Sequence, residues 1–341
     1  MKFLVGRSNL ACTIFVPFDC NNNCPFCTSK KMYKEMANKY DTEAIISLIN
    51  GLNLNFSIKE YVLTGGEPFA NLEATKRLVD AMNKRCFVNT TLPLTDNIDE
   101  VIEYINTCSK IQGINISRHI GFDFKGVADI DVINRIKKPI RINTVINKLF
   151  SFDKFKEFVE KWGSDNRMIN LRADYTKLNT TSLKARDYIE TLLASEYVFN
   201  GAGGCLVCHS STFEADNCYI QYHRGLMFSS VIMEKKTYIN DVIITPDGKM
   251  YKDWDMVEDE EFNTWILKTK DIKPTEIMVD VDWKSDGNIK SYFYSISSTN
   301  RVSLTDDRNK SVKIENSGVL DEVITDIKKT LKENLVRIHT I

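Results

Sequence analysis

The chain has 341 residues, and its 45 lysines and arginines nearly balance its 46 aspartates and glutamates, which excludes an overall attraction to nucleic acid or an anionic membrane. A hydrophobic content of 43% with 27% charged residues excludes wholesale disorder and is sufficient for a large core. No apolar run approaches the roughly 20 residues that span a bilayer, and Arg7 interrupts the start before a signal peptide's apolar region, so we expect a cytoplasmic protein.

From residue 11 to about residue 172, short β-branched or aromatic runs alternate with longer amphipathic stretches, which predicts six β–α units around a parallel sheet. Right-handed crossovers curl such a sheet into an open, partial (β/α)6 barrel. The predicted strands are 11–16, 60–64, 86–90, 113–117, 140–146 and 168–172. The predicted helices begin near Asp41, Asn71, Asp96, Val127 and Ser151. In such α/β folds the chemistry gathers at the carboxyl ends of the strands.

The pattern changes near residue 200, where we place a boundary between a barrel domain (1–200) and a smaller α+β extension (201–341). Residues 241–245 and 249–251 are predicted as two strands joined by the tight turn Pro246-Asp247-Gly248. Residues 317–338 carry apolar side chains at three- and four-residue steps, which predicts a terminal packing helix.

Three cysteines, Cys20, Cys24 and Cys27, directly follow the first predicted strand. A disulfide scaffold is disfavoured because such scaffolds serve small secreted domains. One loop can wrap three thiolates around a metal centre, and thiolates favour zinc or iron–sulfur clusters. Zinc requires a fourth Cys or His at local spacing, and none follows nearby. A four-iron cluster usually takes four cysteines, so a triad indicates an iron left open for a substrate or cofactor.

The second predicted strand runs into Gly65-Gly66-Glu67-Pro68. Glycines allow a ligand to approach the backbone closely, and the Glu67 carboxylate can hold an ammonium group. This short motif is weak on its own. Its position one β–α unit after the cysteine triad makes it a candidate site.

Cys-x3-Cys-x-aromatic-Cys followed by Gly-Gly-Glu-Pro is the hallmark of the radical S-adenosylmethionine (SAM) superfamily, which residues 11–172 resemble. The resemblance implies that Cys20, Cys24 and Cys27 ligate three irons of a [4Fe–4S] cluster, while the amino and carboxyl groups of SAM chelate the fourth. It also implies an oxidoreductase-type reaction. The reduced cluster donates an electron into the sulfonium, which releases methionine and a 5′-deoxyadenosyl radical that abstracts a substrate hydrogen atom.

The resemblance further implies the residues that bind SAM. Its amino group would contact Gly65, Gly66 and Glu67, and Phe26 would lie beside the adenine. The family places ribose and carboxylate contacts at later strand ends, where this sequence has Ser117, Asn143 and Arg172. The alternative for these three is that they only face solvent at the barrel mouth. His119 is a candidate proton relay, with a structural hydrogen-bonding role as the alternative.

A second cysteine group, Cys205, Cys208 and Cys218, has three interpretations. Cys205 to His209 matches the c-type haem motif Cys-x-x-Cys-His, which we discount because haem attachment requires export. Zinc with His209 or His223 as fourth ligand is the second. We favour the third, a second iron–sulfur cluster in an extension that resembles auxiliary-cluster (SPASM or twitch) domains. The sequence departs from those domains because no cysteine follows Cys218.

We therefore expect a radical SAM enzyme that acts on a peptide or a small metabolite, with an electron donor such as flavodoxin or ferredoxin. One alternative is a nucleotide-modifying enzyme with the architecture of GTP 3′,8-cyclase, although this chain lacks that enzyme's cysteine spacing and Gly-Gly tail. Another alternative is a non-catalytic iron–sulfur or zinc protein. The net charge disfavours RNA as a substrate. The substrate, the bond changed and the fate of SAM are not encoded in recognisable motifs.

Overall fold

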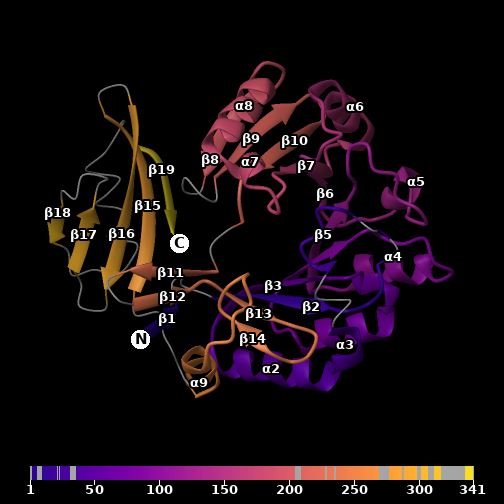
Figure 1. The fold of residues 1–341 in the computed structure, drawn as a ribbon, viewed down its shortest axis with the longest axis horizontal. Helices are drawn as coiled ribbons and strands as arrows, with labels where there is room; N and C mark the ends of the chain where they lie inside the picture. The colour runs from indigo at the N-terminus through magenta and orange to yellow at the C-terminus, as the bar shows by residue number, and fades with distance from the viewer. Residues whose placement is uncertain are drawn as a thin grey trace.

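The structure is a computed structural model, shown in Figure 1. It describes the segments 2–5, 10–20, 22, 24–30, 36–203, 209–226, 229–233, 236–268, 276–285, 288–297, 301–305, 311–315 and 335–340.

Six parallel strands in sequential order form the middle of an eleven-stranded sheet. They are β2 (Leu10–Val16), β3 (Ile58–Gly65), β4 (Cys86–Thr90), β5 (Ile111–Ser117), β6 (Ile140–Val145) and β7 (Arg167–Arg172). Each strand matches a predicted one within two residues at either end. The predicted α/β class with a parallel sheet is confirmed.

Helices follow most of these strands and cover the outer face of the curved sheet (Figure 1). They are α2 (Thr42–Asn55), α3 (Leu72–Ala81), α4 (Ile98–Thr107), α5 (Ile130–Ile133) and α6 (Phe152–Trp162), with α7 (Leu178–Thr181) and α8 (Leu183–Ala194) after β7. The side chains of Asp41, Asn71 and Ser151 accept hydrogen bonds at the starts of α2, α3 and α6, as expected of N-caps. The short α5 begins after Asp129 rather than near Val127.

The two faces of the sheet differ in chemistry because side chains alternate along a strand. Val88, Ile116, Ile142 and Leu171 point to one face, where they are fully buried in a core with the helices. The residues between them form the other face, the inner face. On it, Tyr219 is 45% exposed and Arg141 is also exposed, whereas Asn143 and Asn170 are 9% and 2% exposed, so only part of the inner face is open to solvent.

The sheet continues past residue 200 at both of its edges. Beside β7 lie β10 (Cys218–His223), which is parallel to it, then β9 (Ser210–Ala215) and β8 (Val198–Gly203). Beside β2 lie the parallel β13 (Asp241–Ile244) and the antiparallel β14 (Met250–Tyr251), which form the predicted Asp-Gly hairpin. Residues on both sides of the boundary expected near 200 therefore share one sheet.

Two smaller sheets complete the described structure. One contains β1 (Lys2–Val5), β12 (Lys236–Ile239) and β11 (Ser230–Met233). The other contains β15 (Glu276–Ser285), β16 (Asn288–Ser297), β17 (Arg301–Thr305), β18 (Ser311–Glu315) and β19 (Leu335–Thr340). The short helices η1 (Ala37–Lys39) and η2 (Pro68–Ala70) and the helix α9 (Glu260–Lys268) lie in connections.

The terminal helix predicted over 317–338 is wrong at its end, where Leu335 pairs with Trp283 in β19 and β15. The rest of that prediction, 317–334, lies outside the described residues. Among the helices that the structure describes, none is both long and apolar enough to cross a membrane.

Candidate functional site

The three early cysteines lie in the loop that leaves the carboxyl end of β2. All three side chains are half-buried, and the Cys27 N–H donates to the Cys24 carbonyl at 3.2 Å. Burial, reinforced by the neighbouring Cys27 and Cys20 thiolates, raises the pKa of Cys24 to about 12. The mutual electrostatic effect shows that the three sulfurs share one small region, where a cation or cationic cluster would favour the thiolate forms.

Within the described parts of the chain, no three His, Cys, Asp or Glu side chains are arranged around a single metal ion. A [4Fe–4S] cluster does not require that arrangement, because each cysteine ligates a different iron. Thiolates on one zinc stand about 3.8 Å apart, given Zn–S bonds of roughly 2.3 Å. The donor set of three neighbouring thiols therefore fits a cluster with one thiolate on each of three irons.

The Gly65–Gly66 turn at the end of β3 packs directly against the backbone of the cysteine loop. The Gly66 N–H donates to the Val16 carbonyl at 2.9 Å, and the Glu67 N–H donates to the Phe18 carbonyl at 3.0 Å. A Cβ on Gly66 would overlap the Phe18 carbonyl oxygen, and Gly65 has a φ of 125°. We expected these glycines to admit a ligand, and the structure shows that they also admit the neighbouring loop.

The carboxylate of Glu67 is 2% exposed and accepts four hydrogen bonds. The Phe69 N–H and the Thr90 hydroxyl donate to Oε1 at 3.1 and 2.5 Å. The N–H and the hydroxyl of Thr91 both donate to Oε2, each at 2.6 Å. These four bonds fill the lone pairs of a carboxylate. The expected contact between this carboxylate and an ammonium group is therefore not available in this structure, and Glu67 joins the turn to the end of β4.

Phe26, beside the third cysteine, contacts the loop that follows β5. Its ring lies edge-to-face with His119 at 4.6 Å and near Phe122 at 6.2 Å. Burial, together with the positive charge of Arg118, lowers the pKa of His119 to about 3, so its imidazole is neutral near pH 7. A neutral ring with so low a pKa does not relay protons near neutrality. The hydrogen-bonding alternative is not supported either, because the buried Nδ1 of His119 has no partner among the described residues, and the ring instead packs against Phe26.

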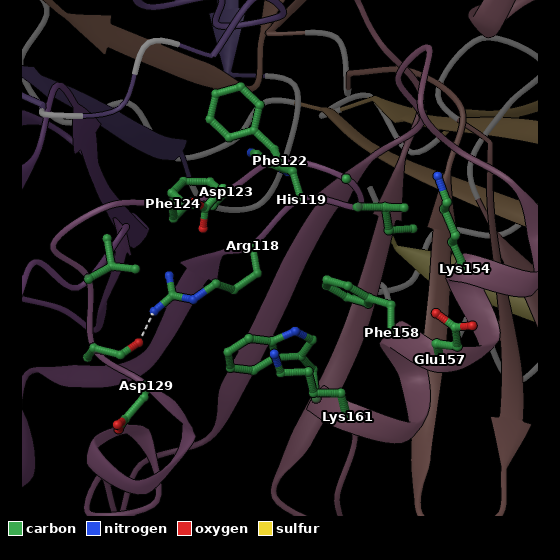
Figure 2. A pocket seen from close by; sticks show the side chains of 15 residues that line it. Arg118, His119, Phe122, Asp123, Phe124, Asp129, Lys154, Glu157, Phe158 and Lys161 are labelled. Carbon is green, nitrogen blue, oxygen red and sulfur yellow. Dashed lines mark hydrogen bonds between the residues drawn. The ribbon is translucent and has the colours of Figure 1, made fainter.

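The same loop closes one side of a cavity of about 460 Å³, whose other side is α6 (Figure 2). Phe124 and the α6 residues Phe158 and Trp162 line it, and Lys154 and Glu157 extend along its α6 side. The Arg118 guanidinium lies 5.8 Å from the Phe124 ring and 5.4 Å from the Trp162 ring, and it donates to the Ala128 carbonyl at 2.5 Å. Neither the three early cysteines nor the Gly65–Gly66 turn lines this cavity, which lies on the helix-covered side of the sheet.

The three predicted strand-end residues all lie on the inner face. Ser117 pairs in register with Asn143, and Arg172 lies two residues beyond Asn170, the register partner of Asn143. Asn143 is 9% exposed, whereas Ser117 and Arg172 are half-buried. The Nε of Arg172 is buried and has no hydrogen-bond partner among the described residues. The three residues therefore share the inner face near the carboxyl ends of β5, β6 and β7.

A row of asparagines on the inner face was not anticipated from the sequence. The Asn89 amide donates to the Thr64 hydroxyl at 3.1 Å, and the Asn115 amide donates to Asn89 at 2.7 Å. On the next two strands, the Asn170 amide donates to Asn143 at 2.7 Å. The signal was present: each of four consecutive predicted strands carries one asparagine, a residue that is depleted in strands.

The second cysteine group is only partly described, because Cys205 and Cys208 lie outside the described residues. Cys218 begins β10, where its register partner is Ala215, whereas His209 immediately precedes the opposite end of the β9–β10 pair. Five residue steps along β10 separate Cys218 from His223, which corresponds to about 17 Å. This placement argues against Cys218 as a ligand of a cluster or zinc site that also uses His209 or His223. His209 instead contacts Glu190.

The fold and the site define an α/β barrel enzyme with its candidate chemistry at the carboxyl ends of parallel strands. Residues 14–165 match the family model described as the Radical SAM superfamily. The chain therefore carries a radical SAM domain over these residues, and radical SAM enzyme chemistry is the activity that this domain supports. This match implies a [4Fe–4S] cluster and SAM as cofactors and gives no support for a second cluster. No curated protein matches the chain.

Replacing Gly66 with alanine should separate the two loops. The new Cβ meets backbone rather than a flexible side chain, and overpacking of this kind costs about 1–3 kcal/mol of stability. We expect less iron per chain after anaerobic reconstitution of Gly66→Ala, measured against protein concentration. Gly51→Ala, in open space on α2, is the matched control and should load iron normally. Normal iron content in Gly66→Ala would contradict a requirement for this contact.

Replacing Glu67 with glutamine should destabilise the fold. Whichever way the amide is oriented, its NH2 group faces one of two buried backbone donors, the N–H of Phe69 or that of Thr91. One unsatisfied buried donor costs about 1–3 kcal/mol in the free energy of unfolding. Urea unfolding of Glu67→Gln should show this loss, whereas Glu73→Gln, at an exposed position, should stay within about 0.5 kcal/mol of wild type. Equal stability of the two variants would refute the assignment.

Proposed function

We propose that this enzyme cleaves SAM reductively and abstracts a hydrogen atom from a peptide or small metabolite, with Cys20, Cys24 and Cys27 as the protein ligands of the cluster. The observation that carries the proposal is the packing of the three-cysteine loop against the Gly65–Gly66 turn. When bound, the cluster would supply one electron for the reductive cleavage of SAM, chemistry that yields methionine and, once a substrate hydrogen atom has been taken, 5′-deoxyadenosine. The electron comes from a low-potential donor such as flavodoxin or ferredoxin.

The Gly65–Gly66 turn, in this proposal, orients the SAM amino group through its backbone carbonyls. The Glu67 carboxylate acts indirectly, because its four hydrogen bonds fix the turn relative to β4. Phe26 provides a ring for the adenine, and its contact with His119 holds that ring in place. Rigid support of this kind is what a site needs in order to position a reactive ligand.

Ser117, Asn143 and Arg172 are the proposed contacts to the ribose and carboxylate of SAM. Their common position near the carboxyl ends of β5, β6 and β7 supports this assignment. The unpartnered Nε of Arg172 is a donor suited to a carboxylate. The hydrogen bond between Asn170 and Asn143 orients the Asn143 amide toward the same part of the inner face.

Replacing Cys24 with alanine should abolish SAM cleavage, because one iron loses its protein ligand. The assay is anaerobic incubation of the reconstituted protein with dithionite and SAM, followed by chromatographic measurement of 5′-deoxyadenosine. Cys108→Ala is the matched control, since Cys108 ends α4 away from the cysteine loop, and it should keep wild-type activity.

The same assay separates the enzyme from a non-catalytic iron–sulfur protein. Wild-type protein that holds a complete cluster and forms no 5′-deoxyadenosine would contradict the proposed function. Zinc in place of iron and sulfide in the anaerobically purified protein would contradict the proposed cluster.

A further inference from the structure

Two arginines on the inner face have no counter-charge of their own. Arg141 lies on β6 and Arg172 lies near the end of β7, and among the described residues neither guanidinium has a salt bridge or hydrogen bond. The Arg141 guanidinium lies 5.8 Å from the centre of the Phe87 ring. That contact positions the guanidinium over the inner face without neutralising its charge.

Two arginines and a histidine from three adjacent strands meet in this region. Burial, reinforced by the charges of Arg172 and Arg141, lowers the pKa of His223 on β10 to about 3. Partial burial, reinforced by the charge of Arg172, also lowers the pKa of Arg141. His223 is therefore neutral near pH 7, and the two guanidiniums are close enough to repel each other, which an anion between them would relieve.

The protein supplies little negative charge here. On β3 to β7 and β10, the inner-face positions carry one carboxylate, Glu60. It already pairs with Arg85 at 3.0 Å, and the Arg85 guanidinium lies 5.9 Å from the centre of the Phe87 ring. Glu60 forms its ion pair with Arg85, and its charge also raises the pKa of Arg141 against the larger lowering effects of burial and Arg172. Arg141 has no ion pair of its own among the described residues, so its guanidinium remains available to a ligand.

The position of Arg141 separates it from the proposed SAM contacts. Arg141 precedes Asn143 by two residues, about 7 Å farther from the carboxyl ends of the strands, and its register partner is Met168, four residues before Arg172. Its side chain is exposed on the inner face. A ligand that reaches Arg141 therefore extends deeper into the barrel than the strand ends.

We propose that Arg141 binds an anionic group of the substrate, a carboxylate or phosphate, on the inner face of the barrel. This inference rests on the proposed function for the meaning of "substrate" and names its chemical class. A guanidinium binds either oxyanion through paired N–H donors, so both sources share one recognition chemistry. Deep binding of the anionic end would leave the rest of the molecule pointing toward the strand ends, where SAM is proposed to bind.

The test uses the reconstituted full-length chain and two probe anions, inorganic pyrophosphate and malonate, titrated by calorimetry with and without saturating SAM. Arg141→Gln should weaken binding of at least one probe by roughly 10- to 100-fold, the usual effect of removing a charged hydrogen-bond donor. Arg135→Gln is the matched control, because it removes the same charge from an exposed ion pair with Asp99 and should leave both affinities unchanged. The probe that is affected identifies the anion as a phosphate or a carboxylate.

Several outcomes would overturn the inference. They are the absence of binding of either probe to wild type, equal affinity in Arg141→Gln, an equal loss in Arg135→Gln, and complete displacement of the probes by SAM. The last would assign Arg141 to the SAM carboxylate. Arg141→Lys, which keeps the charge, guards against misfolding and should retain part of the affinity. No step of the titration requires SAM cleavage, so failure here and failure of the proposed function are distinguishable.

Discussion

The contact between two backbone loops is the constraint on which the candidate site depends. The loop after β2 and the turn after β3 approach so closely that only hydrogen atoms fit at Gly66, and two interloop hydrogen bonds join them. Parallel pairing of β2 with β3 brings the loops to the same edge, and Glu67 then ties the turn to β4. The position of the three-cysteine loop is thus fixed by contacts that involve β2, β3 and β4. A reaction that depends on an open iron requires such support, because cofactor orientation is what the protein contributes.

The sequence predicted most of the barrel because each β–α unit is a local pattern. The six parallel strands and the caps at Asp41, Asn71 and Ser151 depend on residues close together in the chain. The pairing of the strands at the two sheet edges was harder to predict from sequence. For example, β13 pairs with β2 although more than two hundred residues separate them in the chain. The end of the predicted terminal helix failed for another reason: alternate spacing of Leu335 and its neighbours suits a strand equally well.

The parts of the candidate site that consist of a sequence motif were predictable. The contacts that arise from the pairing of strands were not. The cysteine triad and the Gly65–Gly66 turn were found from residue identity alone. The saturation of the Glu67 carboxylate was not, since its donors Thr90 and Thr91 belong to another strand end. Likewise, the isolation of Cys218 from His209 follows from the antiparallel course of β9 and β10, which the cysteine spacing does not reveal. Register decides which polar side chains meet, and register is a property of the assembled sheet.

The late arrival of β13 has a consequence for biosynthesis. Until residues 241–244 have left the ribosome, β2 has an unpaired edge next to the loop that holds the cysteines. A nascent chain therefore exposes both a pairing-prone strand and three thiols while most of the barrel is already able to form. The hairpin of β13 and β14 covers the edge of β2 only once it has been synthesised. Truncated translation products that end before this hairpin are accordingly the species most exposed to aggregation and oxidation.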